Sequence, residues 1–186
     1  MRLSRRATDQ ELTRWPDWRE LLRLGAVLLV AFLLQTNLAP NIRVMGANPD
    51  FALIIVVCVA LVAGAEVGAV FGFLAGTLVA IALIQPLGLS AFVFVLIGYF
   101  AGRYAETADL SAGFAPLVAV FSATVVAGVL LAVAQSLLER QVPLGFFLGR
   151  VLFPSVVLNT LLAAPLYLVV RLALRGAGDL SAARAR

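Results

Sequence analysis

Long apolar runs, separated by short polar, glycine or proline breaks, dominate the chain. They cover Leu24–Ile42, Phe51–Ala65, Val67–Ile84, Leu89–Gly102, Leu110–Leu138 and Val151–Leu174. A helix needs about 20 apolar residues to cross a bilayer, and the second run is somewhat shorter than that. It can still cross if residues 48–50 form its first turn, where a proline is tolerated and the helix dipole favours an acid. The pattern predicts an all-α, polytopic membrane bundle of about six transmembrane helices.

Small residues recur at every fourth position from the end of the second run through the third, at Gly64, Gly68, Gly72, Gly76 and Ala80. Residues four apart lie on one side of a helix, so these form a nearly straight groove. In a bilayer such a groove lets a second helix approach closely. We therefore interpret this run as the central packing helix. The groove is expected to hold either a helix of a partner protein or another helix of the same chain.

The chain ends carry most of the charge and predict three parts. Residues 1–23 form a basic N-terminal segment, residues 24–175 the transmembrane domain and residues 176–186 a tail. The basic start and first apolar run lack a clean small-residue cleavage site, so we expect an uncleaved first helix. Six spans place both termini on one side, and the arginine distribution predicts that this side is cytoplasmic. Residues 143–150 are interpreted as interfacial or re-entrant.

Composition narrows the function classes. Of the 186 residues, 62% are hydrophobic and 13% are charged, whereas soluble domains average about 45–50% and about 25%. Histidine is absent and there is a single cysteine, Cys58, so no disulfide or multi-cysteine metal site can form within the chain. We find no nucleophile with a base and no paired acids. The sequence predicts no enzyme, no cofactor and no metal, and its net charge of +4 is attributed to membrane orientation, not to nucleic acid.

Two polar residues beside or within the apolar runs have more than one interpretation. Asn159 is costly in a bilayer unless it is hydrogen-bonded, so it marks either a functional pocket or an interhelical hydrogen bond, which we favour. Asp50 either contacts a partner or caps a helix N-terminus.

These features together resemble a known family. Pro49-Asp50 enters an apolar helix, Gly64, Gly68, Gly72 and Gly76 follow, then Pro86-Leu87-Gly88, and the next helix ends in Gly98-Tyr99-Phe100-Ala101-Gly102-Arg103. With Asn159 and Pro165-Leu166-Tyr167 in the last run, the chain resembles the rod shape-determining membrane protein MreD family over about residues 24–175. The family usually has an Asp about six residues before Pro-Leu-Gly, where this chain has Ala80.

The resemblance implies a noncatalytic component of the bacterial cell-elongation complex in the cytoplasmic membrane. Its implied partners are the single-span protein MreC and, within one complex, RodA, a class B penicillin-binding protein and MreB. It also implies a fold similar to the substrate-binding component of energy-coupling-factor transporters. The residues proposed for partner binding or helix packing are Pro49, Asp50, Gly64, Gly68, Gly72, Gly76 and Asn159.

A substrate-binding component of a vitamin or small-molecule transporter is the alternative. It requires polar or aromatic groups converging on a cavity, for which Asp50, Gln85 and Asn159 are few. The small-xxx-small pair expected in the first helix of such a component is also missing from Gly25–Ala31. Vitamin binding by the purified protein distinguishes the two functions.

Overall fold

The structure is a computed structural model that describes residues 18–43, 46–84, 88–107, 114–137 and 152–175. Its regular elements are all helices. They are α2 (Trp18–Leu33), continued by the π-helix η1 (Leu34–Leu38) and the 3-10 turn η2 (Ala39–Asn41), then α3 (Phe51–Ala63), α4 (Ala65–Ala82), α5 (Leu89–Thr107), α6 (Ala115–Leu137) and α8 (Phe153–Arg175). Five of them, with α2 extended to Asn41, are long and apolar enough to cross a membrane, and α3 is shorter. The predicted all-helical membrane bundle is confirmed, with five long helices in place of six.

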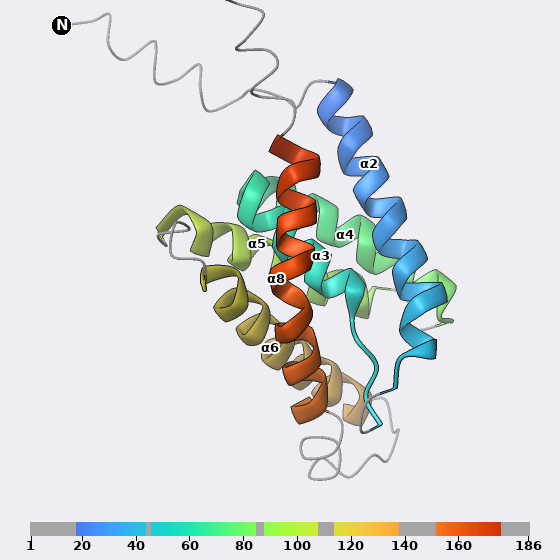
Figure 1. Cartoon of the computed structure of the whole chain (residues 1–186). Coiled ribbons are helices and arrows are strands. Elements are labelled where there is room, and N and C mark those ends of the chain that lie inside the picture. Colours follow the sequence, from blue (N-terminus) through green and yellow to red (C-terminus); the bar gives the residue numbers. More distant parts are fainter. Residues whose placement is uncertain (1–17, 44–45, 85–87, 108–113, 138–151, 176–186) are drawn as a thin grey trace, which may run out of the picture.

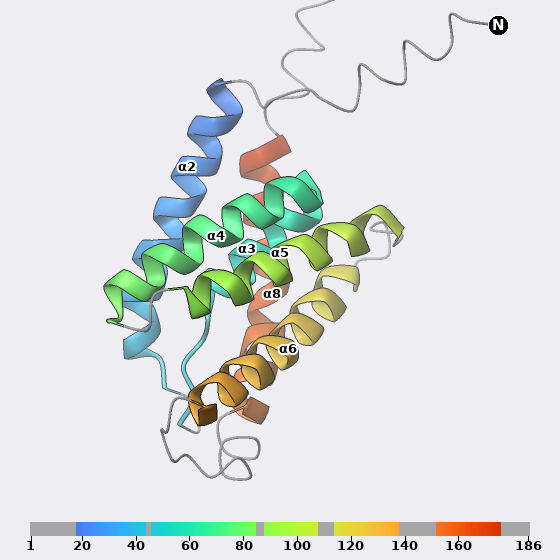
Figure 2. The same ribbon diagram turned by 180° about the vertical axis from the view of Figure 1, so that it is seen from behind.

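Helix α3 is the centre of the bundle, and the expectation that the glycine-rich helix occupies this place is wrong. Every residue from Phe51 to Leu61 is buried, and α3 packs against α2, α4, α5, α6 and α8. Helix α4 instead lies at the surface, where the side chains of Val70, Phe73 and Ile81 are more than half exposed. Figures 1 and 2 show α3 enclosed between α8 on one side and the α4–α5 pair on the other.

The start of α3 differs from the prediction. Residues 48–50 do not form a helical turn, because α3 begins at Phe51 and Asp50 is its N-cap. With 13 residues and about 1.5 Å per residue, α3 is about 20 Å long, shorter than a hydrocarbon core of about 30 Å. In Figure 1 the chain turns below α2 and rises as an irregular segment to the start of α3. Within this segment Ala47 and Pro49 are buried, whereas Gly46 and Asn48 are exposed.

Helix α2 lies at the edge of the bundle and begins six residues earlier than predicted, at Trp18. The first residue of α2 and the last residue of α8 lie at the same end of the bundle (Figure 1). This arrangement agrees with an even number of passes of the chain. The predicted segment 143–150, most of the basic N-terminal segment and the tail lie outside the described residues.

Candidate functional site

The N-terminus of α3 lies inside the bundle and creates a need for hydrogen-bond acceptors. The first N–H groups of any helix have no partner within the helix. Where water is excluded, each unpaired group costs several kcal/mol. Side chains from neighbouring elements have to supply the missing acceptors.

Two acceptors lie close to this helix end along the sequence. Asp50 caps α3, because its Oδ1 accepts a hydrogen bond from the Leu53 N–H at 3.0 Å. Gln35, from the π-helix η1, accepts a hydrogen bond from the Ala52 N–H through its Oε1 at 3.1 Å. The capping interpretation of Asp50 is thereby confirmed, and Gln35 ties the end of α2 to the start of α3.

The third acceptor comes from a residue 109 positions away from Asp50. Asn159, on α8, is 1% exposed and accepts a hydrogen bond from the Asp50 N–H through its Oδ1 at 2.9 Å. Its Nδ2 donates to the Thr124 Oγ1 on α6 at 3.4 Å. The Thr124 hydroxyl in turn donates to the Val120 carbonyl oxygen at 2.8 Å. The interpretation of Asn159 as an interhelical hydrogen-bonding residue is confirmed.

We refer to Gln35, Asp50, Thr124 and Asn159 as the α3 cap cluster, because together they join η1, α3, α6 and α8. Neither Gln35 nor Thr124 is among the residues proposed from the sequence. Gln35, Thr36 and Asn37 are three polar residues near the end of the first apolar run. Such a group indicates the membrane–water interface when the next helix is assumed to start outside the membrane. Only the inward position of the α3 N-terminus gives Gln35 its partner.

The glycine-rich face of α4 packs against α5 of the same chain. A Cβ on Gly76 would lie 2.6 Å from the Ala91 Cα, and one on Gly68 would lie 2.6 Å from the Gly98 carbonyl oxygen. A Cβ on Gly72 would clash with the Phe94 carbonyl oxygen. The backbones of α4 and α5 therefore touch, which Figure 2 shows as two antiparallel helices side by side. We call this contact the α4–α5 seam.

The α4–α5 seam also depends on glycines of α5. A Cβ on Gly98 would clash with the Gly68 carbonyl oxygen, and one on Gly102 would clash with Ala65. Both belong to the motif that ends the fourth apolar run, although neither was proposed as a packing residue. The two ends of the predicted stripe are Gly64 and Ala80. Gly64 lies outside α4, at its junction with α3 with φ at 91°, a conformation that favours glycine, and Ala80 is fully buried.

The polar groups at this site hold helices together. Within the part of the chain that the structure describes, no group of three or more His, Cys, Asp or Glu side chains could hold a metal ion. The side chains of the α3 cap cluster bind backbone N–H groups or one another. The arrangement fixes one short helix among four elements, and its chemistry is that of a structural junction.

The family model for the rod shape-determining protein MreD matches residues 20–176, which include nearly all of every described helix. The chain belongs to the MreD family. Comparison with curated proteins and with solved structures gave no match. In this MreD-family protein, Ala80 occupies a position with no exposed surface, so the carboxylate expected there from the family resemblance is replaced by a small apolar side chain in the core.

Proposed function

We propose that this MreD-family protein is a noncatalytic integral component of the bacterial cell-elongation complex, where it binds MreC and supports peptidoglycan synthesis and cell-shape control. The observation that carries the proposal is the family match over residues 20–176, which coincides with a bundle containing five helices able to span a membrane. RodA, a class B penicillin-binding protein and MreB are the further partners that the family resemblance implies. We extend to this chain the family's implied likeness to energy-coupling-factor substrate-binding components.

The proposed mechanism is recognition by shape within the bilayer. Lipid tails are as apolar as leucine, so helix association in membranes depends on close packing and on interhelical hydrogen bonds. The bundle supplies a surface of defined shape because the α3 cap cluster and the α4–α5 seam fix its helices. The single span of MreC would pack on the outer surface of this bundle.

We assign the predicted site residues to helix packing within this chain. The Asp50 N–H donates to Asn159 and the Asp50 carboxylate accepts from the Leu53 N–H. Pro49 is buried, and α5 packs against Gly68, Gly72 and Gly76, with Ala60 of α3 also in contact at Gly68. Since none of these surfaces is open, we place the contact with a partner elsewhere. We also assign Gly64 to a structural role within this chain, because it forms the junction between α3 and α4.

The proposed location is the cytoplasmic membrane, with both termini in the cytoplasm. Arg19 and Arg23 lie at the start of α2, and Arg171 and Arg175 lie at the end of α8. Those two helix ends share one end of the bundle (Figure 1). Arginines near the ends of spans remain on the cytoplasmic side, which supports this orientation.

Depletion and capture test the proposal. A rod-shaped host depleted of the protein should become round, and the wild-type gene should restore the rod form. Affinity capture of the tagged protein from detergent-solubilised membranes, followed by mass spectrometry, should recover MreC. A matched variant, Gly76→Leu, should lower the membrane level of the protein, and the MreC recovered should fall in the same proportion if Gly76 acts through packing.

Four outcomes would contradict specific parts of the proposal. Unchanged cell shape after depletion would remove the role in elongation, and failure to recover MreC with a full level of bait would remove the partner. A Gly76→Leu variant that keeps its membrane level but loses MreC would show that the α4–α5 seam contacts the partner directly. Purified protein that bound a vitamin would favour the transporter function instead.

A further inference from the structure

Helix α2 is attached to the bundle differently from the other spanning helices. Only 11% of the residues in its spanning window are buried, against 28–44% in the other four. Within α2 itself the one buried residue is Ala31. Its far end is held more firmly, because Gln35 binds the Ala52 N–H and Ala39 is buried. The helix is therefore anchored at one end and loosely packed over the rest of its length.

The backbone changes type between these two parts. Residues 34–38 form a π-helix and residues 39–41 a 3-10 turn, whereas α2 before them is α-helical. Single π turns are rare, occur at functional sites and are among the few causes of helix kinks. Thr36 Oγ1 donates to the Phe32 carbonyl oxygen at 2.8 Å and Asn37 Nδ2 to the Leu33 carbonyl oxygen at 3.1 Å. Such side-chain bonds to backbone often bend helices, so η1 has the properties of a hinge.

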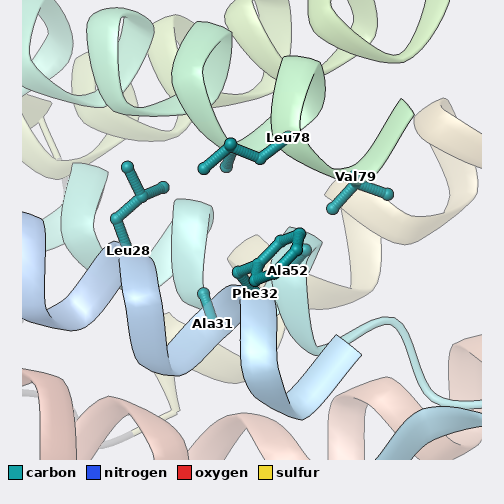
Figure 3. A pocket seen from close by; sticks show the side chains of 7 residues that line it. Leu28, Ala31, Phe32, Ala52, Leu78 and Val79 are labelled. Carbon is teal, nitrogen blue, oxygen red and sulfur yellow. The ribbon is translucent and has the colours of Figure 1, made fainter. Parts of the chain in front are cut away.

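The contact that holds α2 against α4 consists of apolar side chains. Figure 3 shows Leu28 and Phe32 of α2 opposite Leu78 and Val79 of α4, with a narrow hollow between them that has no room for a water molecule. The hollow is completed by three alanines, Ala31, Ala52 and Ala75. Separating these surfaces breaks packing contacts at the hollow and the contacts that α2 makes with α3 and α8, and lipid chains can replace apolar packing contacts because they are equally apolar. Movement of α2 away from α4 therefore carries a low cost in a bilayer.

We propose that α2 swings about η1 as a lateral gate, which opens the hollow between α2 and α4 to lipid acyl chains. The pivot is the π-helix with its Gln35 anchor, and the moving part is residues 18–33. This inference goes beyond the proposed function, because the motion belongs to the isolated protein and requires no partner.

The size of the motion follows from the geometry of α2. The helix has 16 residues and at about 1.5 Å per residue is about 24 Å long. A swing of about 20°, the angle above which a helix bend is a sharp kink, moves its first turn by about 8 Å. A displacement of this size is measurable as a distance between two spin labels.

Pulsed electron paramagnetic resonance on the full chain in lipid nanodiscs tests the proposal. Labels are placed in a Cys58→Ala background at three exposed positions near one end of the bundle, through Leu22→Cys on α2, Val70→Cys on α4 and Leu172→Cys on α8. The two pairs that include position 22 should each show a second distance population displaced by up to about 8 Å. The 70–172 pair, which uses the same sites without α2, should show one population.

A fourth labelled position locates the pivot. The pair Leu38→Cys and Leu161→Cys, which joins η1 to α8, should show one population because η1 is anchored. If both pairs that include position 22 give distance distributions as narrow as that of the 70–172 pair, the gate is overturned. A distance distribution with two populations for the 38–161 pair would overturn the hinge at η1. Leu21→Cys replaces Leu22→Cys if the latter protein is not monodisperse. These results do not depend on MreC, so failure of the gate and failure of the proposed function are distinguishable.

Discussion

Asn159 is the residue that does most to connect distant parts of the chain. It accepts a hydrogen bond from the Asp50 N–H and donates to Thr124, so one amide joins α8 to α3 and α6. The sequence indicated that Asn159 needs a hydrogen-bond partner, because an unpaired amide in a bilayer is costly. The identity of the partner required the structure, since the pair is separated by 109 residues.

Asn159→Leu should lower the free energy of unfolding by about 1–2 kcal/mol, because it leaves the Asp50 N–H without its acceptor in an apolar setting. The adjacent residue gives a matched control. The buried Thr160 hydroxyl has no hydrogen-bond partner among the described residues, so Thr160→Val should leave stability nearly unchanged. Reversible unfolding in mixed micelles, followed by circular dichroism, measures both variants. Equal losses in the two would show that Asn159 acts only through its packing.

Gln35→Leu tests the second external acceptor of the α3 cap cluster. The change removes the oxygen that accepts the Ala52 N–H and should cost about 1 kcal/mol of stability. Asn37→Leu serves as its control, because Asn37 lies in the same π-helix but is exposed and donates only to the nearby Leu33 carbonyl oxygen and Thr36 hydroxyl. The same unfolding measurement applies. If Asn37→Leu loses more stability than Gln35→Leu, η1 contributes to stability through its own backbone geometry and not through the hydrogen bond to Ala52.

At the scale of elements, the sequence predicted where the helices lie along the chain, but it did not predict which helix lies at the centre of the bundle. The predicted run Val67–Ile84 corresponds to α4 at Ala65–Ala82, because the breaks between runs are marked by charge, proline and glycine. The buried position of α3 was not predicted. In water a polar face shows which side of a helix is exposed, but in a membrane both lipid and protein neighbours are apolar. The uniformly apolar α3 therefore carries no signal that separates a central helix from a lipid-facing one.

Glycines were the one element-level signal of helix contact, and two of them give a controlled comparison. Gly76→Ala should lower stability by about 1–3 kcal/mol, because its new Cβ would lie 2.6 Å from the Ala91 Cα and backbone atoms cannot move without separating the helices. Gly25→Ala should be neutral or stabilising by up to about 1 kcal/mol through helix propensity, since nothing lies within 4 Å of its position.

Thermal unfolding of both glycine variants in the same detergent, together with their levels in membranes, provides the measurement. Helix propensity alone predicts that alanine stabilises at both positions. Opposite signs for the two substitutions would therefore identify backbone contact as the cause. Stabilisation by Gly76→Ala would show that the α4–α5 seam is looser than the structure describes.

At the scale of the whole molecule, the topology depends on whether the short α3 carries the chain across the membrane. The sequence predicts six passes, whereas five of the described helices are long enough to cross a membrane and α3 has only 13 residues. We predict that α3 crosses together with the irregular segment before it, in which Ala47 and Pro49 are buried. Hydropathy alone cannot predict this solution, because the segment from residue 46 to residue 50 includes the polar residues Asn48 and Asp50.

Single cysteines in the Cys58→Ala background test this topology. Arg43, Glu66 and Thr107 are exposed and lie after η2, at the start of α4 and at the end of α5. In intact spheroplasts, an impermeant maleimide should label Arg43→Cys, whereas Glu66→Cys and Thr107→Cys should react only after the membrane is opened. The expected sides follow from the arginines at the start of α2 and the end of α8, which favour the cytoplasm. Position 66 is decisive, because it lies one residue after α4 begins. If Glu66→Cys reacts from the same side as Arg43→Cys, α3 does not carry the chain across, and the even number of passes is wrong.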